Sequence, residues 1–427
     1  MNNTRAGWFS TVGGFLSTTV SSGVVTIFVF GIFAPALGKQ FGWSREFVHH
    51  GLSMCAIGTG IGSVCLGYAM DQWGVRRATA GMVLLFGVSL FCIASLPESP
   101  ALYIAMMFAA GFMAAAATPS PYSLAVSASL TTTRGLALGI INAGNGLGGV
   151  LIPLLARHLL AQYGWRVGFM GVAVVVAALP MLALWLLVRL PENYEATRLE
   201  RRKLARENAD PLLKIMKTSP QFWILVFAVF CTSIATFGAL SQTIEILRDR
   251  KVQMAAIATI MGAASLSSTC SRVGVGFLLD RFFAPYVTSV VFGLVAVGIF
   301  LITSGGANDT QLVFGAALLG VGLGAEADLM AYLVSRYFSI YSFGRVNGAL
   351  WLFFCWGGAA GMYLLNACLS ITGSYQFALY SFVAVNVMGL LMILRLGPYK
   401  FALNHQKQVL TEEQTVAVAK ERNGGLI

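Results

Sequence analysis

Charged residues are scarce in this sequence. Of its 427 residues only 11% are Asp, Glu, Lys or Arg, whereas 57% are hydrophobic. Soluble domains carry a charge on about a quarter of their residues, so this composition excludes a water-soluble enzyme of similar length. Low-complexity tracts and repeated glycine triplets are also missing, which excludes a disordered or collagen-like chain. The composition predicts a polytopic membrane protein.

Motifs for metal, redox and nucleotide chemistry are missing as well. The seven cysteines all lie in apolar stretches, and none belongs to a C-x-x-C pair, so we interpret them as small core residues. No G-x-x-x-x-G-K-[S/T] run, which would cradle a nucleotide phosphate, is present. We therefore expect no cofactor, no metal site and no enzymatic activity.

Long apolar stretches make up most of the chain. A helix needs about 20 mainly apolar residues to cross a bilayer, and the alternating segments of a membrane β-barrel are not visible. The sequence therefore predicts an all-α integral membrane protein with twelve transmembrane helices. We place them near residues 15–38, 47–70, 78–96, 101–129, 135–161, 166–189, 220–247, 254–279, 286–305, 311–337, 344–371 and 375–397.

A single long polar segment divides these helices into six and six, and the basic residues of the loops set their orientation. With the N-terminus inside, the cytoplasmic side collects 20 Lys and Arg residues and the outer side 7. We thus expect both termini to be cytoplasmic, in a cell inner or plasma membrane, and the net charge of +11 to reflect topology instead of nucleic-acid binding. The predicted parts are an N-terminal bundle (1–189), a cytoplasmic loop (190–219), a C-terminal bundle (220–400) and a cytoplasmic tail (401–427).

The two halves repeat each other's loop motifs. The loop after the second predicted helix reads G-Y-A-M-D-Q-W-G-V-R-R (67–77), and the loop after the eighth reads G-F-L-L-D-R-F-F-A-P-Y (276–286). An Arg-Gly pair opens the fifth helix at 134–135, and a Gly-Arg pair opens the eleventh at 344–345. Two similar halves around a central cavity are the architecture of many secondary transporters.

These motifs resemble the major facilitator superfamily over nearly the whole chain. The 67–77 loop is similar to the superfamily's signature G-x-x-x-D-x-x-G-x-R-R. Within the superfamily the sequence most resembles bacterial monocarboxylate porters and oxalate:formate antiporters, in the segments 41–45, 134–140, 271–281 and 326–338. The resemblance implies two six-helix halves that give alternating access to a central site, with gating residues in the repeated loops: Asp71, Arg76, Arg77, Asp280 and Arg281.

Arg272 is the candidate for holding a substrate. It lies inside the eighth predicted helix, one turn after Ser268, and an ionisable side chain at that depth requires an explanation. A guanidinium matches a carboxylate through two parallel hydrogen bonds, and the resemblance implies an anion-binding arginine at this place. The alternative is an internal ion pair with Glu326, Asp328 or Glu245.

The sequence also departs from its apparent relatives. Ser268 stands where animal monocarboxylate porters have an Asp, and the eleventh helix holds no Lys or Arg, whereas an oxalate-type antiporter would have a second cation there. A dianion on Arg272 alone would keep one charge uncompensated in a low-dielectric site. The sequence therefore favours a monocarboxylate over a dicarboxylate.

Glu326 and Asp328 are the candidates for proton coupling, because a buried carboxylate can load and release a proton as its exposure changes. They are rotated about 200° apart on a helix, so we expect one to face the cavity and the other a neighbouring helix. A purely structural role for either is the alternative. Glu245 is a third candidate, but it lies three residues from Arg248 and can pair with it instead.

Neutral side chains complete the candidate site. Pro119 and Pro121 are expected to bend or break the fourth helix, and irregular backbone at membrane depth lines cavities. For the asparagines, hydrogen bonds between helices are the alternative role. The candidate substrate-binding residues besides Arg272 are Tyr122, Asn142, Asn145, Ser268, Tyr332, Asn347 and Trp351.

The function predicted from these features is secondary active transport of small organic monocarboxylates by proton symport. One alternative is a proton-driven efflux pump for amphipathic compounds, which would explain the aromatic content, and another is an organic-anion exchanger. The expected partners are the monocarboxylate, the proton and the lipid bilayer, with no nucleic acid, and the chain is expected to be monomeric.

Overall fold

A computed structural model describes the protein over residues 3–190, 194, 211–304 and 308–400. These residues are almost entirely helical, and no strand occurs among them, which confirms the predicted all-α class. Of the predicted central loop, the structure describes Leu190, Tyr194 and the short helix α9 (Pro211–Thr218) with the residue that follows it. The predicted tail at 401–427 lies outside the described residues.

Eleven helical segments of the described chain are long and apolar enough to cross a membrane. The longest, α7 (Arg134–Leu186), turns back on itself at Gly164, whose φ is +78°. Its two arms lie together, with Leu159 of one arm against Gly171 of the other. Counting both arms gives the twelve predicted crossings, the others being built from α1 (Asn3–Thr18) with α2 (Phe30–Phe41), α3 (Arg45–Trp73), α4 (Val75–Ala94), α5 (Pro100–Ala114) with α6 (Ser120–Ser129), α10 (Pro220–Ser241) with α11 (Thr243–Asp249), α12 (Met254–Arg281), α13 (Ala284–Thr303), α14 (Asp309–Tyr337), α15 (Phe343–Thr372) and α16 (Gln376–Ile393).

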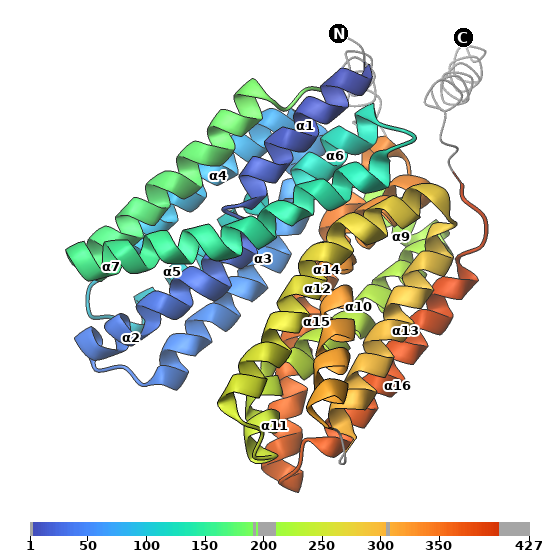
Figure 1. The fold of residues 1–427 in the computed structure, drawn as a ribbon. Helices are drawn as coiled ribbons and strands as arrows, with labels where there is room; N and C mark the ends of the chain where they lie inside the picture. Colours follow the sequence, from blue (N-terminus) through green and yellow to red (C-terminus); the bar gives the residue numbers. More distant parts are fainter. Residues whose placement is uncertain (1–2, 191–193, 195–210, 305–307, 401–427) are drawn as a thin grey trace, which may run out of the picture.

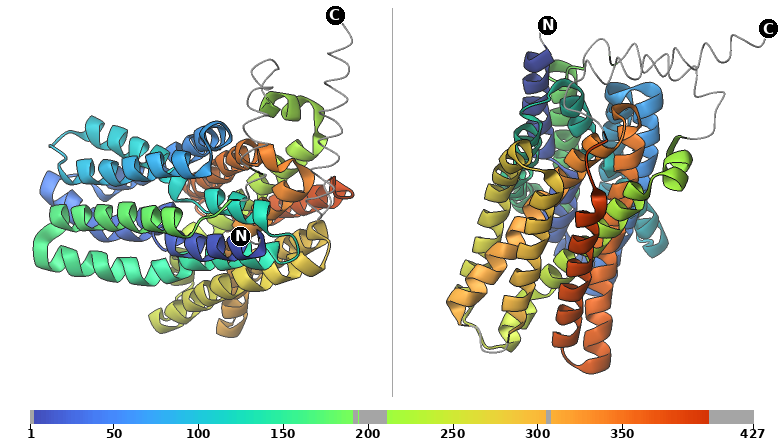
Figure 2. Two further views of the ribbon diagram at one scale, coloured as in Figure 1. Left: turned by 90° about the horizontal axis from the view of Figure 1, so that it is seen from above. Right: turned by 90° about the vertical axis from the view of Figure 1, so that its right-hand side faces the viewer.

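The helices form two bundles, α1–α7 and α10–α16, which we call the N-terminal and C-terminal halves (Figure 1). The start of α1 and Lys400, the last described residue, lie at the same end of the molecule, which we call the terminal end; α11 marks the opposite, far end. Figure 2 shows the molecule from above, where the N-terminal half (blue to green) lies beside the C-terminal half (yellow to red), and from its right-hand side, where the C-terminal half lies in front. In Figure 1 their ribbons meet near the terminal end and diverge toward the far end.

Glycines bring the two halves into direct backbone contact. A Cβ added to Gly67 of α3 would lie 2.2 Å from the carbonyl oxygen of Gly344 in α15, and one added to Gly139 of α7 would lie 2.1 Å from that of Arg272 in α12. No side chain fits at such distances, so small residues are required where helices approach this closely. The halves are therefore joined tightly along the terminal-side parts of these four helices.

The first predicted helix, 15–38, differs from the structure. It begins earlier, at Asn3, and is interrupted after Thr18 before a π-helical turn (Val24–Val29) continues into α2. Ser17 donates its hydroxyl hydrogen to the carbonyl oxygen of Gly13, and such side-chain bonds compete with regular helix geometry. A run of Thr and Ser residues thus ends α1 at mid-depth.

The fourth predicted helix, 101–129, is broken as its prolines predict. Helix α5 ends at Ala114, a 3-10 turn covers Ala115–Ala117, and α6 starts at Ser120, between Pro119 and Pro121. The break lies on buried chain, since α6 has no exposed residue. The prediction of irregular backbone at this point is confirmed.

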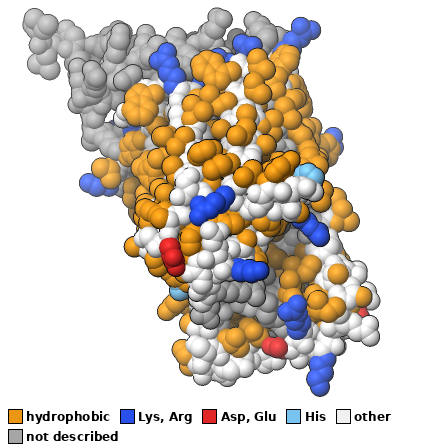
Figure 3. Space-filling view, turned by 90° about the vertical axis from the view of Figure 1, so that its left-hand side faces the viewer, with side chains coloured by type: hydrophobic (Ala, Val, Ile, Leu, Met, Phe, Trp, Pro, Cys, Tyr) orange, Lys and Arg blue, Asp and Glu red, His pale blue; other side chains and the backbone are white. Residues whose placement is uncertain are grey.

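The outer surface is apolar. Figure 3 shows one face of the molecule, on which hydrophobic side chains cover most of the described upper part, whereas the lower part mixes them with other side chains, and Lys and Arg lie at the top and from mid-height downward. Large apolar side chains are exposed on many helices, among them Leu154 at 60% and Leu266 at 68%. Exposed apolar surface of this extent fits a bilayer as the surrounding solvent.

Candidate functional site

Arg272 lies where three helices meet. It belongs to α12, and its backbone carbonyl touches Gly139 of α7 in the other half. One turn earlier, Ser268 is buried with its carbonyl oxygen 2.2 Å from the position of a Cβ on Gly324 of α14. Helices α7, α12 and α14 thus fix the arginine at the interface between the halves.

The Arg272 side chain has no bonding partner among the described residues. Its Nε atom is buried without a hydrogen bond. Asp328 and Glu326 lie within electrostatic range of the guanidinium, but neither forms an ion pair with it in the described part of the chain. The internal ion pair considered from the sequence is therefore not formed with these two carboxylates in this conformation.

Asp328 faces the other half of the molecule. It is fully buried, and its Oδ1 atom accepts a hydrogen bond from the side-chain amide of Asn142 in α7. Asn145 in turn donates to Asn142 at 3.4 Å. A chain of polar groups therefore crosses the interface, and the second carboxylate oxygen of Asp328 makes no hydrogen bond within the described structure.

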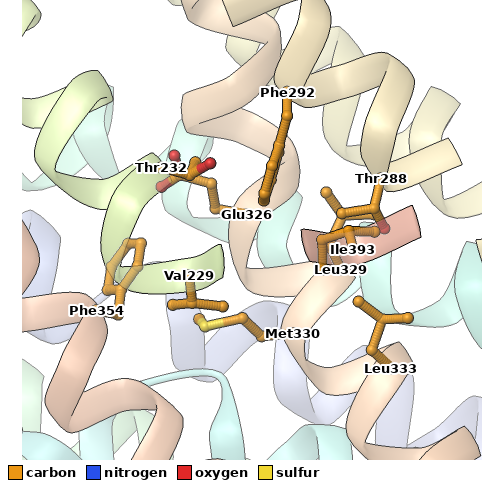
Figure 4. A pocket seen from close by; sticks show the side chains of 10 residues that line it. All are labelled: Val229, Thr232, Thr288, Phe292, Glu326, Leu329, Met330, Leu333, Phe354 and Ile393. Carbon is orange, nitrogen blue, oxygen red and sulfur yellow. The ribbon is translucent and has the colours of Figure 1, made fainter. Parts of the chain in front are cut away.

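Glu326 faces the interior of its own half. Its Oε1 atom accepts a 2.8 Å hydrogen bond from Thr236 of α10, and its Oε2 atom has no partner in the described structure. The side chain borders a small cavity of about 20 Å³ (Figure 4), which has room for one water molecule. Apart from Glu326 the cavity is lined by Val229, Thr232, Thr288, Phe292, Leu329, Met330, Leu333, Phe354 and Ile393. The two carboxylates thus face different surroundings, as their rotation on the helix predicts.

Tyr332 is buried one turn beyond Asp328 on α14, toward the terminal end. Next to it, Arg134 of α7 donates a 2.8 Å hydrogen bond to the Ser335 hydroxyl, so the halves are joined here as well. In the sequence, Arg134 belongs to a repeated loop motif and to the basic loop residues, but it is not among the candidate site residues. Its position in the Arg-Gly pair that opens the fifth predicted helix was the signal for a specific role.

The remaining neutral candidates, Tyr122, Asn347 and Trp351, contact residues other than Arg272. Tyr122 is fully buried in the N-terminal half, where it packs against Gly14 of α1. Asn347 of α15 donates a 2.7 Å hydrogen bond to Ser120 across the interface. Trp351 stacks edge-on against Phe354, with 5.1 Å between the ring centres. None of the three makes a hydrogen bond to Arg272 in the described chain.

Two of the gating candidates join the halves at the terminal end. Asp71 of α3 pairs with Arg345 of α15 at 3.0 Å. Asp280 of α12 accepts hydrogen bonds from the backbone N–H groups of Gly135 and Leu136, at 2.6 and 2.9 Å, and so caps the start of α7. The repeated loops of the two halves therefore make related contacts, each from a carboxylate to the first turn of a helix in the other half.

The other gating candidates have the following contacts within their own halves. Arg76 donates to the carbonyl oxygen of Val188 in the N-terminal half. Arg281 lies over the ring of Phe277 on its own helix at 4.1 Å, and Arg77 is exposed. The side chain of Glu245, the third coupling candidate, lies outside the described part of the structure.

The geometry suits the binding of a small anion. A cation with a free donor is held at the interface between two halves, with amide groups and a carboxylate beside it. A guanidinium in a low-dielectric setting attracts a carboxylate strongly. Within the described residues, no three His, Cys, Asp or Glu side chains are grouped so as to hold a metal ion.

Comparison with known proteins agrees with this architecture. The chain is 24% identical to the gallate transporter of Pseudomonas putida over 360 residues, covering 76% of this chain and 77% of that protein. It is 23% identical to the 4-hydroxybenzoate transporter PcaK of the same species, covering 75% and 77%. The multidrug resistance protein MdtL of Escherichia coli O81 is 23% identical over 87% of this chain and 92% of its own length.

The fold has close counterparts among solved structures. The proton:xylose symporter XylE aligns with a TM-score of 0.73 at 13% identity, over 93% of this chain and 97% of XylE. The model of the Major Facilitator Superfamily matches residues 12–362, which is most of the chain. This protein is therefore a multi-pass membrane transporter that belongs to the Major Facilitator Superfamily.

Proposed function

We propose that this transporter carries small organic monocarboxylates by proton symport, with Arg272 holding the carboxylate. The observation that supports this most is Arg272, whose backbone is held against α7 of the other half and whose guanidinium has no hydrogen-bond or ion-pair partner in the described structure. A carboxylate substrate would supply the missing anion through a bidentate pair. A single cation suits a single negative charge, which favours a monocarboxylate.

An aromatic acid is the substrate class with the most support. Two relatives are named as transporters of gallate and of 4-hydroxybenzoate. Each of these compounds has one aromatic ring and one carboxylate. The C-terminal half offers rings for such a substrate: Trp351 packs on Phe354, which packs on Phe237 at 5.5 Å. Aromatic groups of this kind pair favourably edge to face.

The proposed cycle is alternating access by two rigid bodies, residues 1–189 and 220–400, with the terminal end in the cytoplasm. The 20-to-7 distribution of basic residues supports this orientation. The contacts of Asp71 and Asp280 close the terminal end. In this orientation the present conformation is closed toward the cytoplasm.

Of the two intramembrane carboxylates, we assign the coupling proton to Asp328. Its hydrogen bond comes from Asn142 in the opposite half, so its surroundings change when the halves separate. The contacts of Glu326 lie within the C-terminal half, from Thr236 and the cavity residues, and move with it as one body. A change of exposure with conformation is what a coupling group requires.

Proton-driven efflux of amphipathic compounds is the second candidate, favoured by the similarity to MdtL. Purified protein in liposomes separates the two. With an inward proton gradient, symport predicts accumulation of 4-hydroxybenzoate inside, whereas an efflux antiporter would expel its substrate against the incoming protons. Uptake that requires a second organic acid inside, and no proton gradient, would instead identify an exchanger.

A thermal-shift screen of the detergent-solubilised protein tests the substrate class. A ligand that binds the folded state raises the melting temperature by mass action. We expect aromatic monocarboxylates to do so and the corresponding methyl esters, which lack the charge, to have no effect. A shift with the esters but not with the acids would contradict the proposal and favour the efflux function.

A further inference from the structure

A second buried arginine lies near the terminal end of α14. Arg336 is 6% exposed, and its Nε and Nη1 atoms make no hydrogen bond within the described structure. Its guanidinium carbon lies 4.0 Å from the ring centre of Tyr399. The Tyr399 hydroxyl accepts a 2.7 Å hydrogen bond from the backbone N–H of Ala284, which fixes the ring under the arginine. A buried cation with unused donors is costly unless an anion reaches it in some state of the protein.

The charged groups near this end of α14 already form hydrogen bonds with other protein groups. Arg134 lies within electrostatic range of Arg336 and uses its donors on the Leu130 and Ser127 carbonyl oxygens and the Ser335 hydroxyl. Asp280, an acidic residue within electrostatic range of Arg134 and Tyr332, caps α7 through Gly135 and Leu136. Arg134 is thus held structurally, whereas Arg336 retains its capacity to bind an anion.

Arg336 continues a row of functional groups along α14. Asp328, Tyr332 and Arg336 follow at one-turn intervals and are all buried. The row lies beside α7, which bonds α14 at both ends of the row: Asn142 bonds Asp328, and Arg134 bonds Ser335, the neighbour of Arg336. Separation of α7 from α14 at the terminal end would expose this row, from the Arg272 site to the surface.

From this arrangement we infer that Arg336 is a second carboxylate-binding site, which holds the substrate at the terminal side before it enters the Arg272 site or after it leaves. The inference rests on the proposed carboxylate transport. The site forms only when the halves part at the terminal end, because Arg336 is enclosed in the present conformation. It therefore serves one side of the membrane and not the other.

The test is side-specific transport of radiolabelled 4-hydroxybenzoate by Arg336→Gln in right-side-out and inside-out membrane vesicles. Losing a charge-assisted contact predicts a rise of about tenfold or more in the KM for substrate entering from the terminal side. The KM from the far side should stay within about twofold of the wild type, since that path ends at Arg272. Arg336→Lys keeps the charge and loses the planar fork of donors. Its KM for substrate from the terminal side should lie between those of the wild type and Arg336→Gln.

The control is Arg395→Gln, which removes the same charge from an exposed position at the terminal end and should change neither KM. If Arg336→Gln and Arg336→Lys both keep the wild-type KM for substrate from each side, the inference is overturned. It is also overturned by an equal loss from both sides together with lost binding to solubilised protein, which would make Arg336 structural. If the wild type itself fails to bind any aromatic acid, the proposed function fails first, and that result is distinct from a failure confined to Arg336.

Discussion

Asp328 and Glu326 are two residues apart on α14, yet they touch different parts of the molecule. Asp328 bonds Asn142 in the opposite half, and Glu326 bonds Thr236 in its own. This difference predicts different phenotypes. Asp328→Asn fixes an uncharged side chain, so uptake driven by a pH gradient should fall to the background level. Exchange of labelled for unlabelled substrate needs only the loaded carrier to reorient, and it should survive.

Glu326→Gln is the matched control for that experiment. It makes the same change of one oxygen to an amide on the same helix, and gradient-driven uptake should persist. Both variants must give the size-exclusion profile of the wild type in detergent. Loss of uptake in Glu326→Gln with normal uptake in Asp328→Asn would reverse the assignment of the coupling proton.

At the scale of residues, the sequence identified some groups and missed others for a physical reason. Arg272 and Asp328 stand out because a charge inside an apolar helix is rare. Arg336 lies at a helix end, where basic residues are ordinary topology signals. Its burial depends on Tyr399, more than 60 positions away in the chain, and no local pattern predicts a contact of that kind.

Gly139 on α7 tests the close contact between helices of the two halves. Its hypothetical Cβ lies 2.1 Å from the Arg272 carbonyl oxygen, so Gly139→Val forces α7 away from α12. Overpacking of this kind costs about 1–3 kcal/mol, or a factor of about five or more in a population. The conformation that is closed at the terminal end should become less populated, and the two halves should come closer together at the far end. Spin labels at Lys39 and Lys251, both exposed at the far end, should report shorter distances.

Gly262→Val provides the control on α12, because nothing lies within 4 Å of a Cβ at Gly262. It carries the same helix-propensity change and should keep the wild-type distance distribution. Identical distributions for the two variants would contradict the idea that backbone contact at Gly139 holds the terminal end closed.

At the scale of helices, the sequence predicts a boundary where an apolar run meets a residue that restricts the backbone. The break before α6 follows from Pro119 and Pro121, which restrict the backbone wherever they occur. The early start of α1 could not be predicted in this way, because residues 3–14 include Arg5 and three glycines. Gly7 fits there against Leu130, and Gly14 against Tyr122. Glycines that allow close packing lower the hydrophobicity of a helix, so its start is hard to predict from apolar residues.

The orientation of the whole molecule can be tested by cysteine labelling. In a variant without the seven native cysteines, Lys214→Cys lies exposed on α9 and Lys251→Cys lies exposed at the far end. An impermeant thiol reagent should label position 251 in intact cells and position 214 only after permeabilisation. The reverse pattern would place the terminal end outside and contradict the proposed orientation.

Binding of 4-hydroxybenzoate to Arg272 variants is the most direct measurement on the proposed carrier. Calorimetry on folded, detergent-solubilised protein should show binding by the wild type and by Arg395→Ala, the surface control. Losing one charge-assisted pair costs about 2–5 kcal/mol, so Arg272→Ala should show no measurable binding and Arg272→Lys a strongly weakened one. Near-normal affinity in Arg272→Ala would contradict the assignment of this arginine as the carboxylate-binding residue.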